Sequence, residues 1–235
     1  MHPVLPTDPT APGADTPRLV RLHPGGMTLS QAPVMVGHVR PAACRPLLIA
    51  AGAGVALGVG DLLLQLTLPY PWADLANSSG VWAVAALLLT RLLKTNAAFS
   101  AAAGGVALVI AVEAYYVAAI ILDKAGTGSL LAPSTVAWIA MGAVAGAGFG
   151  VAGAWSRRGE TWHAAAGTAL GVSVLLAEAW QRADQTGTAL LTACLGVALL
   201  AALARRPVVI VRTLPLALVL TPVCFVLFRL AGFGI

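Results

Sequence analysis

Long apolar runs separated by short polar connections dominate the chain from residue 46 onward. Most of these runs approach the length of about 20 residues that an α-helix needs to cross the hydrocarbon core of a bilayer. The regular alternation of apolar and polar residues that a membrane β-barrel requires is not seen. The pattern therefore predicts an all-α polytopic membrane protein with seven transmembrane helices, at residues 46–69, 79–94, 97–122, 132–155, 162–181, 187–204 and 207–230.

Residues with strong local preferences mark some of these helices. Pro69-Tyr-Pro-Trp72 interrupts the chain after the first run, and Asn77-Ser-Ser79 has the residue types of a helix cap before the second. Gly142, Gly146 and Gly150 recur at four-residue spacing in the fourth run, which allows another helix to approach closely. We therefore expect a break near residue 70 and tight packing along one face of the fourth helix.

Residues 1–45 contain no sustained apolar run and are rich in proline. Such a segment buries too little apolar surface to offset the entropy lost on ordering. It also lacks the apolar core of a signal peptide. We expect two parts: a flexible cytoplasmic tail at residues 1–45 and a seven-helix transmembrane domain at residues 46–235.

Composition and charge agree with a membrane protein. Hydrophobic residues make up 59% of the chain and charged residues 10%, whereas soluble domains carry about 25% charged residues. Of the 14 Lys and Arg residues, all but Lys124, Arg182 and Arg229 fall on one side of the predicted helices. Because Lys and Arg favour the cytoplasmic side, this split predicts a plasma-membrane protein with the N-terminus inside and the C-terminus outside. The orientation of the helices accounts for the net charge of +5, so this charge does not indicate a nucleic-acid partner.

Short similarities recur along the chain. Gly54-Val-Ala-Leu57, Gly105-Val-Ala-Leu108 and Gly167-Thr-Ala-Leu170 each precede an acidic residue in the same run. Internal similarity at a regular spacing is the sign of repeated structural units. The helices are therefore compatible with three hairpin repeats plus a seventh helix, although alanine-rich sequence also produces such matches by chance.

Three of the nine acidic residues, Asp61, Glu113 and Glu178, fall inside predicted spans. An ionised carboxylate in hydrocarbon costs several kcal/mol, so such residues usually face the interior of a bundle. Gln65 lies one helical turn after Asp61, and Arg182 lies one turn after Glu178. Glu178 is therefore open to a plain ion-pair role, and Asp61 and Glu113 are each open to a structural hydrogen bond with another helix.

Aromatic residues gather near the same level as these acids. Rings near helix ends are typical of an interfacial belt. Rings beside a protonated acid have another use, because the acid can protonate an alkene or epoxide and the ring faces stabilise the resulting carbocation. We therefore take Glu113, Asp61 and Glu178 as candidate catalytic residues, and as candidate substrate-binding residues Tyr115, Tyr116, Trp82, Trp138 and Gln65.

Motifs for other chemistry are missing from the sequence. The chain has no Walker motif, dinucleotide fingerprint, nucleophile elbow or Asp-rich magnesium motif. Cys44, Cys194 and Cys224 are widely spaced and match no pattern of metal ligands. We expect no cofactor and no metal ion.

A set of short motifs spans about residues 50–180: Asn77-Ser78 with Trp82, then Tyr115-Tyr116, then Gly146 to Gly153 (GAGFGVAG) ahead of Arg157-Arg158. In these motifs the chain resembles a family of small actinobacterial integral membrane proteins of unknown function. By architecture only, its size, seven helices and sparse buried acids resemble the membrane-bound terpene cyclases of indole-terpenoid and meroterpenoid pathways. The second resemblance implies an isomerase that protonates a prenyl chain or its epoxide without metal or nucleotide.

The leading hypothesis is a membrane-embedded terpene cyclase that acts on a lipophilic prenylated molecule. This substrate would enter the protein from the surrounding membrane lipids. Glu113 would donate the proton, and Asp61 would assist or accept the final proton. One alternative is a transporter or binding subunit for a cation or small organic cation, which predicts a water-filled path. Another is a non-catalytic membrane assembly protein, which predicts no ligand-sized cavity beside Glu113. The oligomeric state stays open.

Overall fold

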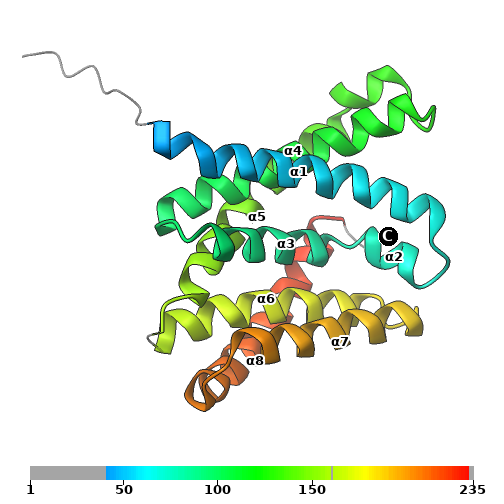
Figure 1. Ribbon diagram of the computed structural model, residues 1–235. Helices are drawn as coiled ribbons and strands as arrows, with labels where there is room; N and C mark the ends of the chain where they lie inside the picture. Colours follow the sequence, from blue (N-terminus) through cyan, green and yellow to red (C-terminus); the bar gives the residue numbers. More distant parts are fainter. Residues whose placement is uncertain (1–40, 160, 233–235) are drawn as a thin grey trace, which may run out of the picture. The chain divides into compact units, whose positions relative to one another are not determined.

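The computed structural model describes residues 41–159 and 161–232 of the 235-residue chain. These residues belong to the second of two units, which divide after His38. They form eight α-helices and one short 3-10 helix, with no strand in this part of the chain (Figure 1). The prediction of an all-α fold is confirmed. Residues 1–40 of the predicted tail lie outside the described residues.

The elements follow in the order α1 (Pro41–Thr67), α2 (Trp72–Ala76), α3 (Ser79–Leu93), α4 (Ala97–Ile121), η1 (Thr127–Leu131), α5 (Pro133–Ser156), α6 (Thr161–Gln181), α7 (Thr186–Leu203) and α8 (Pro207–Leu230). Seven of the α-helices occupy the predicted ranges, and α2 is an additional short helix. The α1 helix begins at Pro41, so it extends into the segment predicted as tail. Ser78 caps α3 as expected, because its side chain accepts a hydrogen bond from the Val81 N–H at 3.0 Å.

Five helices are long and apolar enough to cross a membrane, namely α1 from Cys44 onward, α4, α5, α7 and α8. The α3 helix has 15 residues, which is about 22 Å at 1.5 Å per residue and short for a hydrocarbon core of about 30 Å. The α6 helix has 21 residues but includes buried polar side chains such as Ser173 and Glu178. The described chain thus has the architecture of a helical membrane protein, with five candidate spans where seven were predicted.

Small residues set how closely the helices pack. The α1 helix lies along α4, and α4 lies along α5. A Cβ atom on Gly58 would collide with the carbonyl oxygen of Ala111, and one on Gly146 would collide with that of Gly104. These glycines therefore allow backbone-to-backbone contact between neighbouring helices. The predicted close packing along the glycines of the fourth predicted helix, which is α5, is confirmed.

The observed helix pairs agree only in part with the predicted three hairpin repeats, because two of the three predicted hairpins pack side by side and the first does not. The α4–α5 and α6–α7 pairs each pack side by side, but α1 touches α3 only slightly and lies along α4 instead. The α3 helix packs mainly against α5, and α6 contacts α5, α7 and α8. Leu87 of α3 and Leu175 of α6 are fully buried in the largest apolar cluster. The core therefore lies where α3, α5 and α6 meet.

Candidate functional site

Asp61 is buried on α1 and accepts hydrogen bonds from two side chains. Gln65 donates from Nε2 to Asp61 Oδ2 at 2.6 Å, and Trp82 of α3 donates from Nε1 to Oδ1 at 3.2 Å. Tyr115 of α4 lies near enough to Asp61 and Gln65 to interact electrostatically with both. Four of the predicted site residues therefore converge, from three different helices. We call Asp61, Gln65, Trp82 and Tyr115 the Asp61 cluster.

Glu178 is buried near the end of α6, and both of its carboxylate oxygens are engaged. Oε1 forms an ion pair with Arg182 Nη2 at 3.1 Å. Oε2 accepts hydrogen bonds from Ser78 Oγ at 2.6 Å and from the Gly80 N–H at 2.8 Å. Because Ser78 is the N-cap of α3, the carboxylate satisfies donors at the positive end of that helix. Glu178 therefore fastens α6 to the start of α3.

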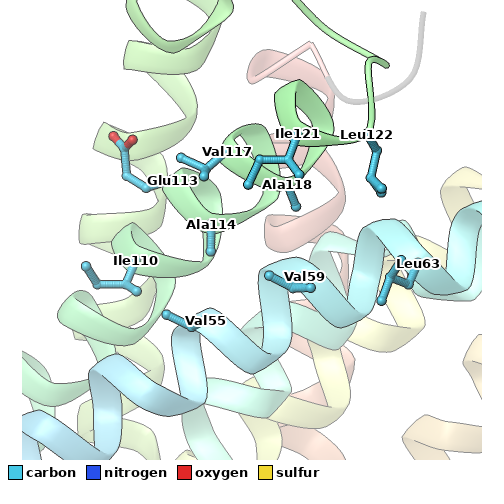
Figure 2. A pocket seen from close by; sticks show the side chains of 10 residues that line it. All are labelled: Val55, Val59, Leu63, Ile110, Glu113, Ala114, Val117, Ala118, Ile121 and Leu122. Atoms are coloured by element: carbon cyan, nitrogen blue, oxygen red, sulfur yellow. The ribbon is translucent and has the colours of Figure 1, made fainter. Parts of the chain in front are cut away.

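Glu113 is half-buried on α4 and has no hydrogen-bond or ion-pair partner among the described residues. It borders a groove of about 500 Å³ between α1 and α4, which we call the α1–α4 groove. The other lining residues are apolar: Val55, Val59, Leu63, Ile110, Ala114, Val117, Ala118, Ile121 and Leu122. Figure 2 shows Glu113 at one margin of the groove, with its carboxylate directed away from α1. The groove is thus an apolar surface with one ionisable group at its edge.

The α1–α4 groove and the Asp61 cluster lie on different sides of the α1–α4 pair. Successive residues of an α-helix are rotated by about 100°, so residues two apart point to nearly opposite faces. On α1, Val59 lines the groove whereas Asp61 bonds to α3. On α4, Glu113 lines the groove whereas Tyr115 lies beside Asp61. Asp61 and Glu113 therefore do not share a site.

The predicted aromatic residues do not line the α1–α4 groove. Tyr115 and Trp82 belong to the Asp61 cluster, and the Tyr116 ring packs edge-on against Tyr115, with centroids 5.5 Å apart. Trp138 lies on α5 and is 37% exposed. Sequence reasoning thus found the residues around Asp61 but not the apolar side chains that accompany Glu113.

A second groove, of about 560 Å³, lies among α6, α7 and α8. Its lining includes Trp180 and two threonines, Thr213 and Thr221, but no ionisable side chain. Within the described residues, no group of three His, Cys, Asp or Glu side chains is placed to hold a metal ion. Of these two grooves, only the α1–α4 groove has an acid among its lining residues, and that acid is Glu113.

A family model described as "Family of unknown function (DUF6518)" matches residues 38–232, which is most of the chain. The chain belongs to this family. No curated protein and no solved structure matches it. The predicted likeness to a family of unknown function is confirmed, whereas the likeness to terpene cyclases gains no support from these comparisons.

Proposed function

We propose that this family member is a plasma-membrane protein that takes a lipophilic prenylated molecule from the bilayer into the α1–α4 groove. The observation that carries the proposal is an apolar groove of about 500 Å³ bordered by a single carboxylate without a partner among the described residues. Volumes of about 300–1,000 Å³ are typical of sites for small molecules. The apolar chain of the ligand would lie against Val55 and Val59, and its polar end would meet Glu113.

Acid-initiated cyclisation is the second candidate function, favoured by the placement of a carboxyl group beside apolar surface. The Glu113 carboxyl would add a proton to an alkene or epoxide, the carbocation would close a ring, and loss of a proton would yield an isomer of unchanged mass. Glu113 would first have to turn toward the groove (Figure 2). Because Tyr115 and Trp82 lie in the Asp61 cluster, they do not supply ring faces there. Binding is therefore the primary proposal.

The other two acids have structural roles in this proposal. Asp61 joins α1 to α3, and Glu178 joins α6 to α3. Passage of a cation, the alternative from the sequence, would need a polar path, and Glu113 is the one ionisable residue among those that line the groove. A purely structural protein would need no groove of this volume. Two acids engaged between helices, together with an apolar groove that has one ionisable residue in its lining, favour a binding protein.

The binding proposal is tested with the full chain in lipid nanodiscs and a photoreactive farnesyl analogue. Val59→Phe fills the groove and Glu113→Gln replaces its carboxyl group with an amide, so both variants should lower crosslinking to α1 and α4. Val144→Phe is the matched control, since Val144 lies on α5, is 76% exposed and lines neither groove. Crosslinking that is insensitive to both groove variants, or equally reduced by Val144→Phe, would refute the proposal.

Cyclisation needs a separate experiment. Membranes that contain the protein are mixed with prenylated indoles and their epoxides, and isomers of unchanged mass are sought by mass spectrometry. We expect Glu113→Gln to abolish isomer formation and Asp61→Asn to preserve it in correctly folded protein. An absence of isomers, or their persistence in Glu113→Gln, would eliminate cyclisation and leave the binding proposal to the crosslinking result.

We further propose that α3 and α6 cross the membrane together with the five candidate spans, with the N-terminus inside and the C-terminus outside. The basic residues at the ends of α3, α5 and α7 support this arrangement, since Lys and Arg favour the cytoplasmic side. After replacement of the three native cysteines, Gly128→Cys should react with an impermeant thiol reagent in intact cells. Gly159→Cys should react only after permeabilisation. Reaction of both in intact cells would contradict the topology.

A further inference from the structure

Three connections meet at one end of the described unit: those between α3 and α4, between α5 and α6, and between α7 and α8 (at the left in Figure 1). Arg157, the C-cap of α5, donates a hydrogen bond to the Thr95 carbonyl in the first connection. Arg206, the N-cap of α8, donates to the Gly159 carbonyl in the second at 3.3 Å. Arginine side chains therefore hold the three connections together.

Three basic side chains belong to this end of the fold: Arg91, Arg157 and Arg205. Arg91 lies in the last turn of α3, and its Nη1 donates to Ser156 Oγ at 2.9 Å, directly before Arg157 in the chain. Arg157 donates to the Thr95 carbonyl, and Arg205 directly precedes Arg206, which donates to the Gly159 carbonyl, so both belong to the same end of the fold as Arg91. Like charges at short range repel, so this arrangement costs free energy unless a counter-charge is present. We call these three residues the arginine cluster.

No carboxylate neutralises the arginine cluster within the part of the chain that the structure describes. The one ion pair there joins Arg182 and Glu178, near the other end of α6. The remaining described acids lie in the second halves of α1 and α4, in α2, and after α4 and α6: Asp61, Glu113, Asp74, Asp123 and Asp184. Arg157 Nε is moreover a buried donor without a partner. Among the described residues, charge and hydrogen-bonding capacity are both left over at this end, and Glu160 of the α5–α6 connection lies outside those residues.

Aromatic residues indicate the depth of this end in a membrane. Trp155 lies in the last turn of α5, and Trp162, which is 58% exposed, lies in the first turn of α6. The Arg212 guanidinium lies over the Trp162 ring, 4.8 Å from its centroid. Tryptophan at the ends of apolar helices favours the membrane–water interface, and long basic side chains reach from there to the headgroups. The arginine cluster is therefore at the level where lipid phosphates occur.

We propose that the arginine cluster binds a phosphate group, carried either by an anionic phospholipid or by a small soluble phosphate. The planar guanidinium presents paired donors that match two phosphate oxygens, which a single ammonium group does not. Three guanidinium groups from α3, α5 and the α7–α8 connection would surround one anion. The bound phosphate cancels their repulsion and bridges three parts of the fold. This site is independent of the α1–α4 groove.

The test uses the full chain in nanodiscs of phosphatidylcholine, with and without phosphatidylglycerol, and native mass spectrometry of the lipid that the protein retains. Arg205→Gln is the main variant, because Arg205 is exposed and its loss should leave the fold intact. We expect about fivefold weaker retention of phosphatidylglycerol, the effect of one basic residue near an anionic lipid surface. Arg229→Gln is the matched control, since it removes the same charge from the last turn of α8.

A third arm separates the two sources of phosphate. Inorganic phosphate is added to protein in pure phosphatidylcholine, and thermal unfolding is measured. Stabilisation by phosphate that Arg205→Gln abolishes identifies a soluble ligand, and retention of phosphatidylglycerol without that stabilisation identifies a lipid. The proposal is overturned if wild type and Arg205→Gln show the same retention of phosphatidylglycerol and the same stabilisation by phosphate. It is also overturned if Arg229→Gln weakens binding equally.

Discussion

The carboxylates near the start of α3 have hydrogen-bond partners, whereas the carboxylate at the α1–α4 groove has none among the described residues. Near the start of α3, Asp61 is buried and accepts a hydrogen bond from Trp82. Glu178 is also buried there and accepts one from Ser78. At the groove, Glu113 is half-buried and has no partner among the described residues. All three lie within similar apolar stretches of sequence. Their states therefore depend on what lies opposite each side chain.

This contrast separates acids that hold helices together from an acid that is free for a ligand. Asp61 or Glu178 could act on a ligand only after giving up existing hydrogen bonds, and a buried group left unsatisfied costs about 1–3 kcal/mol. Glu113 has no such bonds to lose within the described chain. Substitutions at the start of α3 should therefore lower stability, whereas substitution of Glu113 should affect ligand binding alone.

The largest loss of stability is expected for Glu178→Ala. The change leaves Arg182, Ser78 and the Gly80 N–H without their carboxylate, and we expect a loss of about 3 kcal/mol in the free energy of unfolding. Denaturant titration in mixed micelles measures it. Asp184→Ala, which removes an exposed acid just after α6, should have little effect. An equal loss in both variants would remove the special role of Glu178.

The next largest effect is expected where α1 touches α4. Gly58→Leu must push the helices apart, because even a Cβ atom there collides with the Ala111 backbone. The expected loss is about 2 kcal/mol, typical of overpacking, together with a change in the α1–α4 groove. Gly60→Leu is the matched control, since a Cβ atom at Gly60 meets open space. Similar thermal unfolding of the two variants would show that close contact is not needed.

A smaller effect is expected for Trp82→Phe. This change keeps most of the ring but removes the indole N–H that donates to Asp61 at 3.2 Å, so one carboxylate oxygen loses its partner. We expect a loss of about 1 kcal/mol in stability and no loss of farnesyl crosslinking in the groove. Reduced crosslinking without reduced stability would instead assign Trp82 to the ligand site, as the sequence hypothesis held.

The smallest effect on stability is expected for Glu113→Gln. Because Glu113 has no partner among the described residues, its replacement should change the free energy of unfolding by less than about 0.5 kcal/mol. The same denaturant titration applies, with Glu178→Gln as the comparison. A loss as large as that of Trp82→Phe would mean that Glu113 supports the fold, and the contrast between the two regions would disappear.

Contacts within one helix could be predicted from the sequence, and contacts between helices could not. The spacing of four residues correctly indicated the Gln65–Asp61 hydrogen bond and the Arg182–Glu178 ion pair. Trp82 of α3 and Ser78, the N-cap of that helix, became partners of these acids only through the order in which the helices pack. Sequence reasoning also treated Arg91, Arg157 and Arg205 only as signals of orientation. Their alternation along the chain indicated a common side, but not that arginine hydrogen bonds join the connections on that side.

The sequence by itself determined the all-helical class, the approximate helix ranges, the cap at Ser78 and the close-packing glycines of α5. These features depend on interactions within a few residues or on the length of an apolar run, which are local properties of the chain. Only the tertiary structure decided that α1 lies along α4 and that Glu113 and Asp61 face different sides of that pair. The reason is that apolar helices can pack in many orders at similar cost, and the choice depends on shape complementarity between residues far apart in the chain.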